Sequence, residues 1–260
     1  MSTLTSYQLV ARDIGRWRDI TSAKPAVALQ IKYYQQHIGD VKSIDGLLKN
    51  DRLFGIAMQA FGLGDRLYAK GLMKRVLQQG LGGSNTLANR LNDPRIKDFA
   101  RAFNFVVYGA GTTGTVAVKN DVIARYVEQT LEADQGASNP GVELALYFRQ
   151  NAPNLTNTYG ILADRKLLTV VQTALGISPA TSKQDIDLQA KSIDARLKIA
   201  DFKQPAKLQA FVAKFCAMYD ANTMTLDTSG GAGAAVSLFD AGNVSIGADA
   251  LMTLQNLKIR

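Results

Sequence analysis

The feature that most constrains this chain is an internal repeat. Residues 33–63 align without gaps on residues 147–177, at an offset of 114 residues. The match resumes at an offset of 112, where Phe99 corresponds to Phe211. The identical pairs in the gapless part are Tyr33/Tyr147, Gln36/Gln150, Gly46/Gly160, Leu48/Leu162, Leu53/Leu167, Ala60/Ala174 and Gly62/Gly176. We therefore predict a duplication, in which both segments form the same helix–loop–helix unit and Phe99 and Phe211 are equivalent core residues.

Apolar residues recur at helical spacing along most of the chain. The stripes include Val10, Ile14 and Trp17; Val27, Ile31 and Tyr34; Ile96, Phe99 and Phe103; and Ile186, Ala190 and Ile193. Asp93-Pro94 and Asn139-Pro140 each place a capping side chain before a proline, which is typical of a helix start. Gly62 and Gly176 follow apolar stripes, where a left-handed cap favours glycine. We expect an all-α, multihelical fold of about ten helices, with no strand pair before residue 220.

The repeat divides the chain into five parts. We predict an N-terminal helix (1–24), a first helical repeat (25–108), a glycine-rich linker and connecting helix (109–138), a second helical repeat (139–220) and an irregular tail (221–260). The connecting helix is expected at about 115–133. In the tail, the low-complexity segment 228–235 is expected to be a hinge. The apolar residues that follow it are expected to pack on the helical body or on a partner.

Composition excludes several kinds of site. The chain has 260 residues with one His and one Cys, which rules out a zinc site built from His and Cys, a CxxC redox pair and an internal disulfide. The net charge of +8 favours acidic partners, so binding of an acidic partner is one of the alternatives. No run of four or more Lys or Arg occurs, which argues against a dedicated nucleic-acid surface.

Three polar or reactive features each have a structural explanation. Gly109, Gly111 and Gly114 match GxGxxG, but a dinucleotide fingerprint needs a strand on each side, so we interpret this segment as a flexible linker between the halves. His37 lies at a predicted helix end without an orienting acid nearby, and its repeat counterpart is Asn151. Cys216 falls in a helical stripe and is expected to be partly buried packing.

Charged side chains suggest little chemistry. Glu128 and Glu132 stand four residues apart on one predicted helix, a pattern typical of a solvated face. The basic residues Lys70, Lys74 and Arg75 share one helix side, which we interpret as solvated or as a contact for an acidic partner. We therefore predict no catalytic, cofactor-binding or metal-binding residue and no cofactor.

The N-terminus gives no targeting signal. The first twenty residues contain Arg12, Asp13, Arg16, Arg18 and Asp19 and no apolar core of a signal peptide. No apolar stretch approaches the roughly 20 residues that a membrane span needs. We expect a cytoplasmic protein without a membrane span. The alternative is export through a flagellar apparatus that does not require a cleavable signal.

Several stretches resemble one family. YYQQHIGDVKSIDGLLKNDRLFGIAMQAFGL, YAKGLMKRVLQQG, NTLANRLNDPRIKDFARAFNF and LALYFRQNAPNLTNTYGILADRKLLTVVQTALGI are similar to the alphaproteobacterial domain of unknown function 1217, closest to its rhizobial members. The resemblance covers about residues 7 to 220 and implies a multihelical, duplicated fold. Family members are often encoded among flagellar genes. The family brings no catalytic motif, so no functional residue is carried over.

These observations favour a non-enzymatic protein. We expect a structural or protein-interaction protein associated with flagellar assembly or motility, whose partner is another protein such as a flagellar component. One alternative is a basic module that binds nucleic acid or anionic lipid. Another is an enzyme whose site is not visible in the sequence. The sequence does not specify the oligomeric state.

Overall fold

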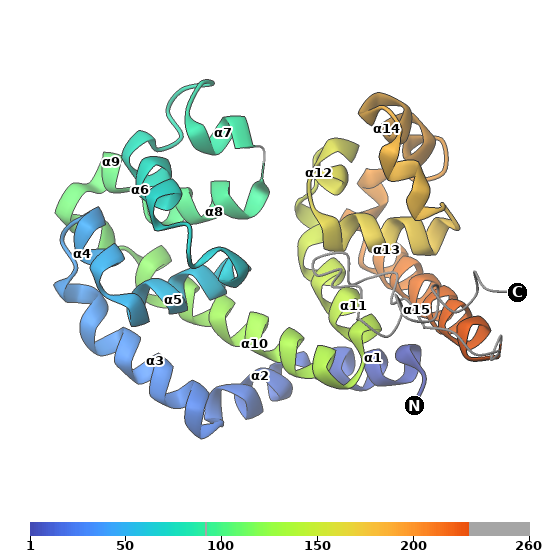
Figure 1. The fold of residues 1–260 in the computed structure, drawn as a ribbon. Helices are drawn as coiled ribbons and strands as arrows, with labels where there is room; N and C mark the ends of the chain where they lie inside the picture. Colours follow the sequence, from blue (N-terminus) through green and yellow to red (C-terminus); the bar gives the residue numbers. More distant parts are fainter. Residues whose placement is uncertain (92, 229–260) are drawn as a thin grey trace, which may run out of the picture. The chain divides into compact units, whose positions relative to one another are not determined.

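The part of the chain that a computed structural model describes, residues 1–91 and 93–228, is helical and contains no strand (Figure 1). This confirms the all-α prediction. Met1–Ala221 form one compact unit, and a second unit begins at Asn222. The predicted hinge and C-terminal segment lie outside the described residues, apart from the end of the last helix at Thr228.

Fifteen α-helices are labelled in the described residues. Those before the middle of the chain are α1 (Thr3–Arg12), α2 (Ile14–Ala23), α3 (Pro25–His37), α4 (Ile44–Lys49), α5 (Asp51–Ala60), α6 (Lys70–Gln79), α7 (Leu87–Leu91), α8 (Pro94–Ala102) and α9 (Phe105–Tyr108). The others are α10 (Val122–Ser138), α11 (Pro140–Asn151), α12 (Thr158–Leu162), α13 (Arg165–Leu175), α14 (Ile186–Asp194) and α15 (Pro205–Thr228). Short 3-10 turns join many of them.

The predicted helix signals are confirmed. The Asp93 carboxylate accepts a hydrogen bond from Arg95 N at 3.0 Å and caps α8. The Asn139 side chain accepts one from Gly141 N at 2.9 Å and caps α11. Gly62 and Gly176, which follow α5 and α13, have φ values of +67° and +64°, a backbone region that L side chains rarely adopt.

The two repeated segments contain the same elements in the same order. α3 leads through the 3-10 turn Ile38–Asp40 into α4 and α5, and α11 leads through Ala152–Asn154 into α12 and α13. A shift of 114 residues brings the bounds of each pair to within one residue. One tertiary contact recurs as well, since Tyr33 donates to Asn50 at 3.3 Å and Tyr147 donates to Asp164. The duplication itself stays a prediction, which this agreement supports.

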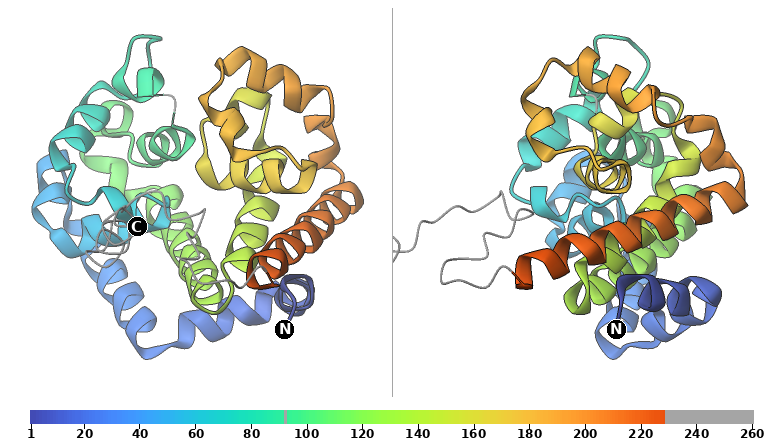
Figure 2. Two further views of the ribbon diagram at one scale, coloured as in Figure 1. Left: turned by 45° about the vertical axis from the view of Figure 1, so that its right-hand side comes forward. Right: turned by 90° about the vertical axis from the view of Figure 1, so that its right-hand side faces the viewer.

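Two separate hydrophobic cores lie within Met1–Ala221. The first is built from α3 to α9 and receives Val122 and Tyr126 from α10. The second is built from α11 to α15 and receives Tyr7 and Val10 from α1. α10 packs against α5 on one side and against α11 on the other. In both views of Figure 2, α15 runs beside α1, where Thr3 N donates to the Asp220 carboxylate at 3.0 Å.

The connecting region differs from the prediction. α10 covers Val122–Ser138 rather than about 115–133, and the π-helical turn Ala117–Asp121 leads into it. The helix continues through Gly136 because the Glu143 side chain of α11 lies where a Cβ would stand, so this end is held by close packing. The helix α8 ends at Ala102, and the Asn104 side chain caps the next helix, α9.

Phe99 and Phe211 are not equally buried. Phe99 is 0% exposed in the first core. Phe211 is half-buried, although it stacks on Phe148 at a centroid distance of 5.3 Å. The expectation that both are equivalent core residues is therefore wrong for their burial, because α15 presents the Phe211 side chain at the edge of the second core.

None of the helices in the described ranges is long and apolar enough to cross a membrane. The prediction that the chain has no membrane span agrees with this finding.

We predict that Phe99→Ala lowers the free energy of unfolding by about 3–5 kcal/mol, because it removes a fully buried ring and leaves a cavity. Phe211→Ala is expected to cost clearly less, because solvent already reaches part of its ring. Urea denaturation of both variants measures the difference. Equal losses would contradict the burial difference.

A second prediction concerns the close contact of three helices at Gly141. A Cβ built there would lie 2.6 Å from Tyr219 Cδ1 and 2.8 Å from Thr3 Cγ2. Overpacking of this kind costs about 1–3 kcal/mol, which exceeds the gain of up to about 1 kcal/mol that alanine brings to a helix. We expect Gly141→Ala to lower the thermal midpoint.

The matched control is Gly55→Ala in the middle of α5, where a new Cβ would meet nothing within 4 Å. This variant is expected to raise the thermal midpoint through its helix propensity. A stabilised Gly141→Ala protein would show that α1, α11 and α15 are less tightly packed than described.

Candidate functional site

A cavity of about 470 Å³ lies within Met1–Ala221 between elements of the two repeats. Its floor is α10, through Arg125 and Gln129. The residues of the first wall, on α5, α8 and the turn after α5, are Ala60, Phe61, Gly62, Pro94, Arg95, Asp98 and Arg101. The residues of the second wall, on α11, α13 and the segment between them, are Tyr147, Gln150, Asn151, Asn154, Leu155, Asp164 and Leu167. The volume falls in the usual range of ligand pockets, roughly 300–1,000 Å³.

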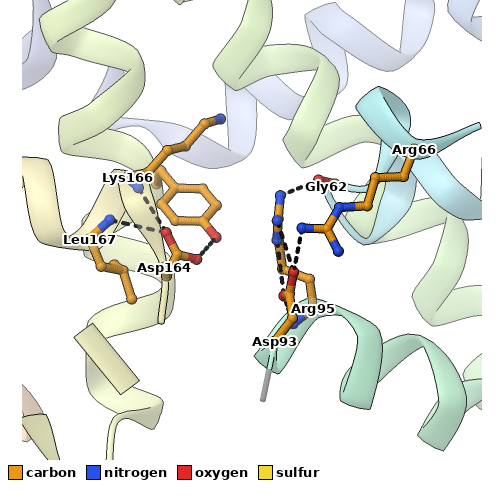
Figure 3. A network of polar contacts seen from close by, with 8 residues as sticks. Gly62, Arg66, Asp93, Arg95, Asp164, Lys166 and Leu167 are labelled. Atoms are coloured by element: carbon orange, nitrogen blue, oxygen red, sulfur yellow. Dashed lines mark hydrogen bonds and ion pairs between the residues drawn. The ribbon is translucent and has the colours of Figure 1, made fainter. Parts of the chain in front are cut away.

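The first wall is organised around Asp93. Its carboxylate accepts from Arg95 Nε at 3.2 Å and from Arg95 Nη2 at 3.0 Å, a bidentate pair, and it also pairs with Arg66 at 3.2 Å (Figure 3). Arg95 Nη1 donates to the Gly62 carbonyl at 2.8 Å. Burial alone would lower the pKa of Arg95, but the hydrogen bonds and charge of Asp93 raise it, so the guanidinium stays charged. Arg95 therefore fixes the turn after α5 to the start of α8.

The second wall is organised around Asp164. Its Oδ1 accepts from Lys166 N at 2.9 Å and from Leu167 N at 3.1 Å, so the residue caps α13 (Figure 3). Its Oδ2 accepts from the Tyr147 hydroxyl. Burial and the Asp164 charge raise the pKa of Tyr147, which keeps this phenol protonated as a donor. The carboxylate has no ion-pair partner among the described residues and places a negative charge in this wall.

The floor and the first wall carry an excess of positive charge. One carboxylate, that of Asp93, serves both Arg66 and Arg95. Arg101 pairs with Asp98. Arg125 lies over the Phe61 ring, 5.0 Å from its centroid, and has no carboxylate within ion-pair distance in the described part of the chain. The cavity is therefore electrically asymmetric, with surplus guanidinium groups facing the Asp164 side.

Gln150 contributes an unused acceptor to the second wall. Its Oε1 is buried and accepts no hydrogen bond from the residues that the structure describes. A buried acceptor without a donor costs free energy, about 1–3 kcal/mol, unless a bound group supplies the donor.

Glu128 and Glu132 are buried, which corrects the prediction of a solvated face. Glu128 is 5% exposed and Glu132 1% exposed, because α2 and α11 cover this side of α10. Glu128 accepts from Arg18 Nε, whereas Glu132 Oε2 accepts from Gln129 Nε2 at 2.9 Å. Burial, together with Glu128 and Glu143, raises the pKa of Glu132 to about 8 against the lowering effect of Lys166.

The other sequence-selected residues lie apart from the cavity. His37 ends α3, is exposed and has its ring 4.4 Å from the Tyr33 ring. Cys216 is fully buried rather than partly buried, and burial raises the pKa of its thiol to about 12, so it packs as an apolar group. The segment Gly109–Gly114 is a 3-10 turn whose Thr113 is buried and donates to the Val41 carbonyl at 2.9 Å, so it is an ordered part of the first core rather than a flexible linker.

The basic face of α6 is partly neutralised by this chain itself. Lys70 pairs with Asp51, and Lys74 pairs with Asp45 at 2.7 Å. The hydrogen bond and charge of Lys74 hold the pKa of Asp45 below its ordinary value. Arg75 is exposed and no ion pair of it is seen in the described residues.

Sequence reasoning did not identify the cavity. Its lining residues are spread from Ala60 to Leu167, and no local motif joins them. One usable signal was present, because a tyrosine precedes an Asx residue by 17 positions in both repeats, as Tyr33–Asn50 and Tyr147–Asp164. In residues 1–91 and 93–228, no group of three or more His, Cys, Asp or Glu is arranged to hold a metal ion.

The buried carboxyl of Glu132 predicts a pH dependence of stability. Below about pH 4.5 both folded and unfolded chains hold the proton, and between pH 4.5 and about 8 only the folded protein keeps it. Stability therefore falls as the pH rises through this range. We expect Glu132→Gln to remove that fall, so that its advantage over the natural protein grows from pH 5 to pH 8 and reaches a few kcal/mol, roughly 2–4.

Urea midpoints at pH 5, 6.5 and 8 measure this effect. Glu128→Gln is the comparison variant, because it breaks the ion pair with Arg18 and is expected to lower stability. Removal of the Glu128 charge is also expected to lessen the rise in the pKa of Glu132, and with it the fall in stability. Parallel pH curves for Glu132→Gln and the natural protein would contradict the raised pKa.

Comparison with known proteins places the chain in a family. The X-ray crystal structure of protein AGR_C_984 from Agrobacterium tumefaciens is similar, with 37% sequence identity, a TM-score of 0.80, and coverage of 85% of this chain and 96% of that one. No curated protein matches the sequence. The family model described as a protein of unknown function (DUF1217) matches residues 60–208, a range that includes the whole lining of the cavity. The chain therefore belongs to the DUF1217 family of proteins of unknown function.

Proposed function

We propose that this chain is a non-catalytic protein-interaction protein that binds its partner through the cavity between the two repeats. The observation that carries the proposal is the composition of the cavity, in which the guanidinium of Arg95, held by Asp93 and by the Gly62 carbonyl, lies opposite the buried carboxylate of Asp164. Surfaces of this kind bind charged and hydrogen-bonding groups of a second molecule.

The charged groups of the cavity walls have structural tasks, which favours binding over catalysis. Asp93 and Asp164 cap helices, and Tyr147 is kept protonated by burial. A general acid or base needs a pKa near the working pH and reach to a substrate. Glu132 has such a pKa, but it lies buried behind the wall and is not part of the cavity lining.

The partner that the family resemblance suggests is a flagellar component. The proposal accordingly includes a role in flagellar assembly or motility and a location in the cytoplasm, or export without a cleavable signal. The alternative of a basic module for nucleic acid or lipid finds less support, since Lys70 and Lys74 are paired with aspartates of the chain itself.

We expect deletion of the gene in the bacterium that encodes it to reduce swimming or the number of flagella. Complementation with the natural gene is expected to restore both, whereas Asn154→Trp, which fills the rim of the cavity, is expected to fail. Soft-agar swimming assays and electron microscopy of flagella measure the outcome.

The matched control for that experiment is Asn120→Trp, which adds the same bulk at an exposed position outside the cavity. It is expected to complement fully. Normal swimming and normal flagella in the deletion strain would refute the flagellar role. Full complementation by Asn154→Trp would show that the function does not depend on the cavity.

A further inference from the structure

The charged side chains that line the cavity do not all have a counter-charge. Two of the three arginines in the lining, Arg95 and Arg101, each pair with an aspartate. Arg125 and Asp164 also line the cavity, and neither has an ion-pair partner among the residues that the structure describes. The lining therefore presents one guanidinium and one carboxylate that are not neutralised within the chain.

These two groups belong to different sides of the cavity. Arg125 stands on the floor helix α10 and lies over the ring of Phe61, a residue of the first wall. Asp164 stands in the second wall beside Tyr147, and 6% of each residue stays exposed. Figure 3 shows Asp164 opposite Arg95 of the first wall. The positive charge is thus placed with the floor and first wall, and the negative charge with the second wall.

The second wall is suited to an ammonium group. The Asp164 carboxylate accepts hydrogen bonds from Lys166 N, Leu167 N and the Tyr147 hydroxyl. A carboxylate has about four acceptor positions, so it can accept from one more donor, and the oxygen of the Tyr147 hydroxyl is a second acceptor. An ammonium group has donors and no acceptor, which matches this pair.

The floor is suited to a carboxylate. The Arg125 guanidinium is exposed and has no carboxylate partner in the described part of the chain. A guanidinium fork matches a carboxylate and binds it more strongly than a neutral acceptor. A ligand of one charge sign would be attracted by one side of the cavity and repelled by the other, whereas a zwitterion would be attracted by both.

The lining between the two charges suits a peptide backbone. Gln129, Asn151 and Asn154 contribute amide groups, which both donate and accept hydrogen bonds as a peptide bond does. Leu155 and Leu167 are buried apolar residues on which small side chains can pack. The volume of about 470 Å³ lies at the small end of ligand pockets and limits the occupant to a few residues.

We propose that the cavity binds a short peptide with free ends. Its ammonium group pairs with Asp164 beside Tyr147, and its carboxylate pairs with Arg125. The juxtaposition that carries this inference is an unpaired guanidinium and an unpaired carboxylate on two sides of one cavity. The inference goes beyond the proposed function, because it concerns a small ligand that would compete with a partner protein for the cavity.

The probe is trialanine, titrated by calorimetry into the full chain at neutral pH and low salt. Acetylation of its amine or amidation of its carboxylate removes one charge, and we expect each change to weaken binding about tenfold. Alanine has both charges but no peptide bond. It is expected to bind more weakly than trialanine, because each further residue adds roughly 3.3–3.6 Å of reach.

Two variants assign the ends of the peptide. Asp164→Asn retains an oxygen that can cap α13, and it is expected to make trialanine and acetyl-trialanine bind equally well. Arg125→Gln is expected to make trialanine and trialanine amide bind equally well. A merely structural effect of either substitution would weaken the binding of all three peptides alike.

Matched control variants lie outside the cavity. Asp185 is exposed and caps α14 through Asp187 N and Leu188 N, as Asp164 caps α13. Arg196 is exposed and does not line the cavity. Asp185→Asn and Arg196→Gln are expected to change the affinity for trialanine less than twofold, because exposed charges at a distance are screened.

Four results would overturn the proposal. They are no binding of trialanine, equal binding of the free and blocked peptides, equal losses in the cavity variants and their controls, and tighter binding of alanine than of trialanine. The last result would assign the cavity to single amino acids. None of them decides the proposed function, since the swimming of strains that carry Asn154→Trp is measured without a peptide.

Discussion

The structure of Met1–Ala221 depends on one helix that contributes to the first core and packs against a helix of the second. α10 sends Val122 and Tyr126 into the first core and packs its later turns against α11 of the second. Between these contacts it presents Arg125 and Gln129 to the cavity. Because a helix is a stiff rod over 17 residues, the separation of the cavity walls follows from where each repeat meets α10. Ion pairs to α10 from Arg18 of α2 and from Lys24, the residue after α2, add little stability but help to fix the rotation of α10.

Local signals predicted the helices well, because they act through backbone groups close in the sequence. The side chains of Asp93 and Asn139 cap helices as their positions before a proline indicate, and Gly62 and Gly176 take the left-handed conformation. The start and end of α10 were harder to predict. The end of α10 packs closely against α11 at Gly136, a contact that local periodicity does not contain.

The sequence was misleading where polar residues are buried. Glu128 and Glu132 follow the spacing of an exposed helix face, yet α2 and α11 cover them. Arg18, whose partner is Glu128, lies 110 positions away, so the compensating contact is invisible in any local window. The cavity was missed for the same reason, since its walls come from segments about 100 residues apart. The sequence did contain the repeat. It indicates two similar units but gives no information about the cavity between them.

The two repeated segments also share one polar contact. In each, a tyrosine hydroxyl donates to the side chain that caps the next helix, as Tyr33 does to Asn50 and Tyr147 to Asp164. The geometry is shared because both residues accept hydrogen bonds from the first turn of the helix. The two side chains differ chemically, since Asn50 has an amide where Asp164 has a carboxyl group.

Of these two capping residues, only Asp164 lies in the cavity wall, opposite the guanidinium of Arg95. A neutral asparagine there would cap α13 equally well, so capping by itself does not require an aspartate. The negative charge is therefore a property of the cavity rather than of the helix. It sets the sign of the second wall against the arginine side.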